Sequence, residues 1–100
     1  MKIVTFNKFD TSFIDDKHVV EDFQNSTGDA QVAIIDIDTI FDFEENKGTA
    51  CADKYVSVAI IEDDGDYDAF KNFGIDAWVK SADLKDLNAL LNLIEKRSLS

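Results

Sequence analysis

The stretch QVAIIDID, Gln31 to Asp38, decides the fold of this 100-residue chain. It places four apolar residues in a row, at positions 32–35, and then two carboxylates, Asp36 and Asp38. An uninterrupted apolar run of this kind is typical of a strand that is covered on both faces, as in the parallel sheets of α/β proteins. Ligand sites in such sheets lie beyond the carboxyl ends of the strands. The stretch therefore predicts that Asp36 and Asp38 stand at the functional edge of a sheet.

The segments around this stretch alternate between strand and helix patterns. β-branched and aromatic residues predict further strands at 2–6, 55–61 and 77–80. Helices are predicted at 39–48 and at 67–73, where a glycine follows the second helix and ends it. Strands separated by helices predict a single α/β domain, residues 1–100, with a parallel four- to five-stranded sheet between two helix layers.

Two further helices are predicted from the spacing of apolar residues. The C-terminal helix has Asp83 as its N-cap and repeats apolar residues every three or four positions. These residues are Leu84, Leu87, Leu91 and Ile94. Residues 8–28 also carry apolar residues at helical spacing, and a short strand is the alternative for this region. The residues concerned are Phe9, Phe13, Val20 and Phe23.

The charge balance excludes several classes of partner. The chain has 10 basic and 21 acidic residues, a net charge of −11. Nucleic acid and anionic membranes are bound through clusters of Lys and Arg, so neither is expected to be a direct partner. The single cysteine, Cys51, cannot form an internal disulfide, and no apolar run is long enough for a signal peptide or a membrane span. We therefore expect a cytoplasmic location.

From Gln31 onward the sequence resembles the receiver domain of two-component response regulators. QVAIIDID is similar to the third strand of that family, with Asp36 at the phosphoacceptor position. AFKNFGIDAWVKSADLKDLNALL is similar to the run from its fourth to its fifth helix, with Gly74 at the turn glycine and Lys80 at the active-site lysine. The resemblance covers residues 31–100 and implies a flavodoxin-like fold. It also implies that Lys80 approaches Asp36, either for phosphoryl transfer or as a structural ion pair.

The sequence departs from the family pattern at the positions that carry the chemistry. The family has an acidic pair for Mg²⁺ after the first strand, but Asn7 and Lys8 stand there. The position of the family's hydroxyl residue on the fourth strand falls on Ile60. Trp78 lies two residues before Lys80, whereas the family's switch aromatic lies at an odd offset from the lysine. The interval between Asn7 and Asp36 is also barely long enough for one βαβ crossover of roughly 30 residues. We therefore expect one βα unit to be lost or collapsed.

The resulting prediction is an atypical, stand-alone receiver domain that acts in signal transduction through protein contacts, with phosphorylation absent or vestigial. It predicts no enzymatic activity and no cofactor. Trp78 and Phe70 are the expected contact residues, and the partner is a histidine kinase, a signalling target or a second copy of the chain. The first alternative is a phosphoacceptor in a two-component phosphorelay, in which Asp36 takes phosphate, Lys80 pairs with it, and Asp36 and Asp38 help to hold Mg²⁺.

A second alternative belongs to another class of protein. Asp36, Asp38 and Thr39 also resemble the start of the active site in the haloacid dehalogenase phosphatases, where an apolar strand leads into a D-x-D motif. The threonine stands one position early for that family, and no acidic motif follows Lys80. A small phosphatase of this kind is therefore the less favoured enzyme.

Overall fold

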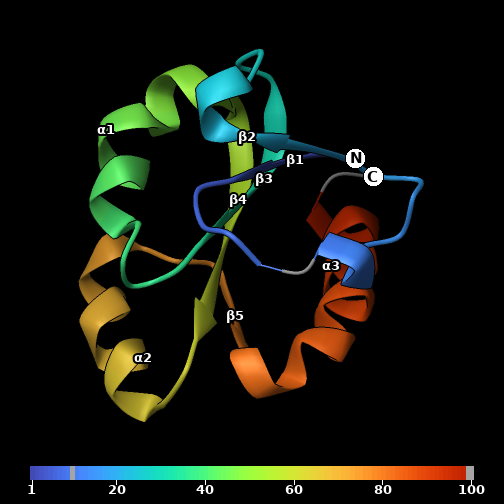
Figure 1. The fold of residues 1–100 in the computed structure, drawn as a ribbon. Coiled ribbons are helices and arrows are strands. Elements are labelled where there is room, and N and C mark those ends of the chain that lie inside the picture. The colour runs from blue at the N-terminus through green and yellow to red at the C-terminus, as the bar shows by residue number, and fades with distance from the viewer. Residues whose placement is uncertain (10, 99–100) are drawn as a thin grey trace.

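The computed structural model describes residues 1–9 and 11–98 and shows an α/β fold built on one sheet. Five parallel strands form this sheet, in the order β2-β1-β3-β4-β5. They are β1 (Lys2–Thr5), β2 (Val19–Asp22), β3 (Ala30–Ile35), β4 (Cys51–Ile61) and β5 (Ala77–Lys80). Helices flank both faces of the sheet, so the predicted three-layer α/β class is confirmed and is compatible with a flavodoxin-like topology (Figure 1).

The helices divide between the two faces. The α-helices are α1 (Ile40–Ala50), α2 (Asp64–Phe70) and α3 (Leu87–Ser98). Figure 1 shows α1 and α2 on one side of the sheet and α3 on the other. Short 3₁₀ turns complete the layers: η1 (Thr11–Phe13), η2 (Phe23–Asn25), η3 (Lys71–Phe73) and η4 (Ser81–Asp86). None of the described helices is both long enough and apolar enough to span a membrane.

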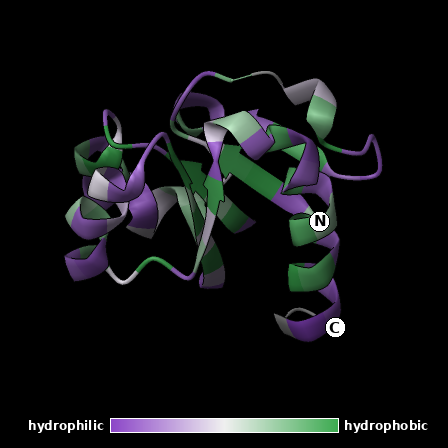
Figure 2. Ribbon diagram, turned by 90° about the horizontal axis from the view of Figure 1, so that it is seen from below, coloured by the Kyte–Doolittle hydropathy of each residue, from purple (hydrophilic) through white to green (hydrophobic). Residues whose placement is uncertain are grey.

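Alternation along the strands produces two hydrophobic cores. Ile35, Ala59 and Ile61 point toward α1 and α2, where they pack with the fully buried Phe70 and with Phe43, which is 2% exposed. The other face packs against α3 and includes Ile34, Val58 and Ile60 from the strands, with Leu87 and Leu91 from the helix. In Figure 2 the strands at the centre are mostly hydrophobic, whereas the helices beside them alternate between hydrophilic and hydrophobic residues. The four residues 32–35 are fully buried, which is the double coverage that their sequence predicts.

The prediction of a helix within residues 8–28 is wrong, and the alternative of a short strand is confirmed. Within the described residues, this region holds β2 between the 3₁₀ turns η1 and η2 and contains no α-helix. Three of the four apolar residues at helical spacing pack on two different cores, and Phe13 is 40% exposed. Phe9 and Val20 pack on the α3 side, whereas Phe23 stacks on Phe6 at 4.8 Å between ring centroids on the α1 side. One helix could not cover both faces of the sheet.

The C-terminal helix begins later than the sequence predicts. Asp83 has φ −113° and ψ 25°, which is not helical, and residues 81–86 form η4 before α3 starts at Leu87. Asp83 therefore marks a kink before the 3₁₀ turn that leads into α3, and the α-helix itself starts four residues after the predicted N-cap. The glycine stop is confirmed, because Gly74 has φ 68° in the left-handed region directly after η3.

Candidate functional site

The carboxyl edge of the sheet holds Asp36 directly after β3, as predicted, but its carboxylate is engaged in a local turn. Asp36 Oδ1 accepts hydrogen bonds from the backbone N–H of Asp38 at 3.0 Å and from the hydroxyl of Thr39 at 2.9 Å. The backbone N–H of Asp36 donates to Thr39 Oγ1 at 3.1 Å. These bonds fix the turn that leads into α1. Asp36 therefore has a structural role at the start of this helix.

Lys80 stands at the same edge, but it does not form the expected pair with Asp36. Its Nζ lies 3.5 Å from Asp64 Oδ1 at the start of α2. Lys80 is two residues after Trp78 and is paired with Ile61 on β4, so its side chain lies on the same face of the sheet as theirs. This is the face that carries α1 and α2. Among the described residues, Asp36 forms no ion pair. The Lys80–Asp64 bridge is exposed and adds little stability, since exposed pairs contribute about 0–1 kcal/mol.

A pocket of about 320 Å³ surrounds Asp36 on the other side of the edge. Its walls come from the ends of β1, β3 and β4, from the start of α2 and from η4. Polar and charged lining residues are Asn7, Lys8, Asp36, Asp38, Glu62, Asp66 and Ser81. Apolar lining residues are Phe9, Ile37, Ile60 and Leu84.

Asn7 is the unusual member of this pocket. Its side chain is 8% exposed, and its Oδ1 is a buried acceptor for which the described residues provide no hydrogen-bond donor. Buried polar atoms of folded proteins nearly always have a partner. The sequence shows an asparagine after β1, but only the structure shows that its amide oxygen is unsatisfied.

The residues present do not fit a Mg²⁺ site. Asp36 and Asp38 line the same pocket, yet the described part of the chain contains no group of three or more acidic, histidine or cysteine side chains placed to hold a metal ion. Lys8 lines the pocket beside them and repels a cation. The hydroxyl of Ser57 is not available either, because it donates to Asp76 Oδ2 at 3.1 Å within the sheet.

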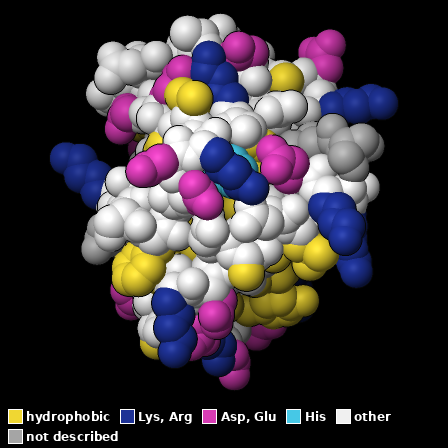
Figure 3. Space-filling model, turned by 90° about the vertical axis from the view of Figure 1, so that its right-hand side faces the viewer, with side chains coloured by type: hydrophobic (Ala, Val, Ile, Leu, Met, Phe, Trp, Pro, Cys, Tyr) yellow, Lys and Arg dark blue, Asp and Glu magenta, His cyan; other side chains and the backbone are white. Residues whose placement is uncertain are grey.

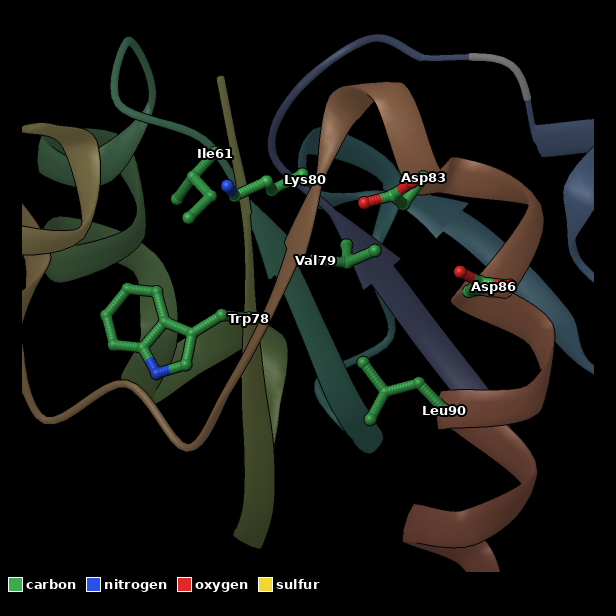
Figure 4. Close-up of a pocket in the computed structure, with 7 residues that line it drawn as sticks. All are labelled: Ile61, Trp78, Val79, Lys80, Asp83, Asp86 and Leu90. Atoms are coloured by element: carbon green, nitrogen blue, oxygen red, sulfur yellow. The ribbon is translucent and has the colours of Figure 1, made fainter. Parts of the chain in front are cut away.

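A second pocket, of about 410 Å³, lies at the outer edge of β5. In Figure 4 its residues come from both sides of this edge strand. Ile61, Trp78 and Lys80 line one side, and Val79 and Leu90 line the other. Asp83 and Asp86 add carboxylates from η4. The described residues pair β5 with β4 alone, so one side of this strand is free of strand partners.

The two predicted contact residues lie together at this edge. Trp78 is half-buried, and its ring centroid lies 4.6 Å from that of Tyr67 and 5.7 Å from that of Phe70. Phe70 is fully buried, so the expectation that it touches a partner is corrected. It supports the ring of Trp78 from beneath because it belongs to the core of the α1–α2 face.

The remaining reactive side chains are buried. Burial raises the pKa of the Cys51 thiol to about 11, which keeps it protonated and unreactive at neutral pH. His18 is 5% exposed, and its Nε2 lies 3.4 Å from Asn92 Oδ1 on α3. Figure 3, which views the side that carries α3, shows this histidine only as a small patch beneath a basic side chain.

Comparison with protein-family models, curated proteins and solved structures finds no match for this chain.

Proposed function

We propose that this chain is a receiver-like protein-binding module that works without phosphoryl transfer and associates with a second copy of itself through the edge of β5. The observation that carries the proposal is the placement of Lys80. It pairs with Asp64 on α2 instead of approaching Asp36. Lys80 is therefore not placed to pair with a phosphoryl group on Asp36, and the described residues around Asp36 do not form a Mg²⁺ site to neutralise it.

The edge of β5 supports the contact. An unpaired edge strand offers backbone donors and acceptors, and two such edges can pair across a two-fold axis. Trp78 and Leu90 supply apolar area on either side of the strand. The charges at this edge also complement each other, because Lys80 of one copy can meet Asp83 or Asp86 of the other.

Sedimentation velocity over a range of protein concentrations tests this association. Trp78→Ala should weaken it at least about tenfold, as expected for a central aromatic anchor. Asp36→Asn and Phe41→Ala should leave it unchanged; Phe41 is a matched aromatic control, 72% exposed on α1. Added salt should strengthen association, because it screens the repulsion between two chains of net charge −11.

A charge exchange keeps the test independent of any folding defect in the tryptophan variant. Lys80→Glu and Asp86→Lys should each weaken self-association, and the double variant should restore it. The phosphoacceptor alternative is tested beside it by incubation with acetyl phosphate and Mg²⁺, followed by intact-mass measurement. A phosphoryl adduct that is lost in Asp36→Asn would overturn the proposal, as would a parent protein that stays monomeric at all concentrations.

A further inference from the structure

The segment that forms β5 is complementary to itself in the antiparallel direction. Residues 76–80 read DAWVK, with an acid at one end, a base at the other and a tryptophan in the middle. When the segment is placed beside a copy that runs the opposite way, the two Trp78 residues face each other and Asp76 faces Lys80 at both ends. The apolar residues between them face each other as well. Identical strands that carry such a pattern have matched neighbours at every position.

The side chains of this segment divide between the faces of the sheet as such pairing requires. Trp78 packs on the core of the α1–α2 face, and Lys80, two residues further on, lies on the same face. Asp76 precedes Trp78 by two residues, and its carboxylate accepts a hydrogen bond from Ser57 of β4. Val79 leaves the strand on the opposite side, where it packs with the core under α3 (Figure 4). The tryptophan and both charges are therefore presented together on one face.

The backbone of β5 offers the matching hydrogen-bonding groups. The N–H of Asp76 donates to the carbonyl oxygen of Ser57 at 3.1 Å, so it faces β4. Backbone groups alternate in direction along a strand, which leaves those of Ala77 and Val79 facing outward, where the described residues provide no further strand. In antiparallel pairing, two residues that face each other in this way exchange both of their hydrogen bonds. Ala77 of each copy can therefore bond to Val79 of the other, on both sides of Trp78.

Other antiparallel registers use less of the strand. A register centred on Val79 forms one such exchange within β5 and places Ala77 opposite Ser81, which already belongs to η4. A register centred on Lys80 places two ammonium groups opposite each other, and like charges in that position are unfavourable. The register centred on Trp78 has neither defect. It also brings the two indole rings together, and the pocket of about 410 Å³ beside Trp78 leaves room for the second ring.

The charged ends of the segment are available for pairing between copies. Both bonds from Ser57 reach Oδ2 of Asp76, and Oδ1 of Asp76 has no hydrogen-bond partner in the described part of the chain. Asp76 is exposed and forms no ion pair with the described residues. The bridge from Lys80 to Asp64 is exposed, so exchanging it for another carboxylate costs little.

We propose that two copies of the chain join their β5 strands in the antiparallel register centred on Trp78, so that their two sheets become one continuous sheet. The two-fold axis passes between the paired Trp78 rings, and Lys80 of each copy meets Asp76 of the other on either side of it. This inference rests on the self-association proposed above and adds its register, its backbone bonds and a further ion pair. It makes the edge strand specific for a second copy of the chain.

Disulfide trapping tests the register directly. Ala77→Cys and Val79→Cys, mixed in equal amounts with oxidised glutathione, should give the mixed dimer, because facing residues have Cα atoms about 5.5 Å apart. Either variant alone should give little dimer, since identical positions lie about 9 Å apart in this register, beyond the reach of a disulfide. The possible dimers differ in mass and are distinguished by intact-mass measurement. Gln24→Cys is the matched control, exposed in η2 next to the opposite edge strand, and it should not be trapped with either variant.

The ion pair is tested separately by sedimentation velocity. Asp76→Asn keeps an acceptor for Ser57 but removes the charge that faces Lys80, so self-association should weaken by about fivefold. Asp53→Asn, exposed in the first half of β4, changes the net charge of the chain equally and should not weaken it. Both substitutions lower the general repulsion between two acidic chains, so a loss in Asp76→Asn alone identifies the specific contact.

The register and the self-association can fail separately. A parent protein that associates, while Val79→Cys is trapped with itself or no cysteine dimer forms at all, would overturn the register and leave the association standing. Equal association of Asp76→Asn and the parent would overturn the ion pair between copies. A parent protein that remains monomeric at all concentrations would overturn the self-association, and the register with it.

Discussion

Replacing Asn7 by leucine should stabilise the protein, although most substitutions of buried residues destabilise. Asn7 is 8% exposed, and its Oδ1 loses its hydration on folding without gaining a hydrogen bond from the described residues. Leucine has a similar size and no polar atom. Removing an unsatisfied buried acceptor recovers about 1–3 kcal/mol, so we expect the free energy of unfolding to rise by at least about 1 kcal/mol. For a domain of this size, that corresponds to an increase in Tm of roughly 4–8 °C.

Ser57 provides the matched control, because it is also a buried polar residue of the sheet but has partners. It is 3% exposed, its hydroxyl donates to Asp76 Oδ2 at 3.1 Å, and it accepts from the backbone N–H of Asp76 at 3.1 Å. Ser57→Ala should therefore lower the free energy of unfolding by about 1 kcal/mol, the net contribution of a satisfied bond. The two substitutions remove similar chemistry and should have opposite signs.

Equilibrium unfolding in urea measures both effects through the fluorescence of Trp78, the single tryptophan. The midpoint should move to higher urea for Asn7→Leu and to lower urea for Ser57→Ala, with the slope of each transition unchanged. A lower midpoint for Asn7→Leu, with an unchanged slope, would refute the reasoning. It would show that the amide of Asn7 has a stabilising partner in solution.

Three other predictions concern stability and reactivity. Gly74→Ala should lower the free energy of unfolding by about 1–2 kcal/mol, measured in urea, because Gly74 has a φ of 68°. Gly28→Ala should lower it further, because the added Cβ would lie 2.8 Å from the backbone oxygen of Thr49. Asp63→Ala should cost about 1 kcal/mol in the same assay, because Asp63 caps α2 by accepting from the backbone N–H of Gly65 at 2.8 Å. Cys51, with its pKa raised to about 11 by burial, should react with a thiol reagent at pH 8 about a hundredfold more slowly in the folded protein than in urea; equal rates would contradict its burial.

The sequence predicts the strands better than their connections. The run at 32–35 identifies β3, since a strand covered on both faces needs apolar residues at every position and the pattern is local. The region of Phe9 to Phe23 is predicted wrongly because spacing along the chain does not tell which face of a sheet each side chain will cover. Here Phe9 and Val20 pack on one core and Phe23 on the other, whereas Phe13 is exposed.

The candidate site is predicted only in part, for a related reason. Asp36 follows β3 and Lys80 ends β5, so the parallel strands place both residues at the same edge of the sheet. Whether they meet depends on side-chain direction and on competing partners, which involve contacts distant in sequence. In the structure, the partner of Lys80 is Asp64, the first residue of α2. The unsatisfied oxygen of Asn7 is likewise a property of packing, and no sequence pattern reports it.

The segment after β1 shapes the pocket around Asp36. It leaves the sheet at Asn7 and adds Lys8 and Phe9 to the pocket wall. The register of β5 places Lys80 on the face that carries α1 and α2, so Lys8 is the one ammonium group among the described residues that line the pocket around Asp36. Beside this pocket, the buried oxygen of Asn7 has no hydrogen-bond partner among the described residues and lowers the stability of the fold. The Asn7→Leu variant measures that cost directly.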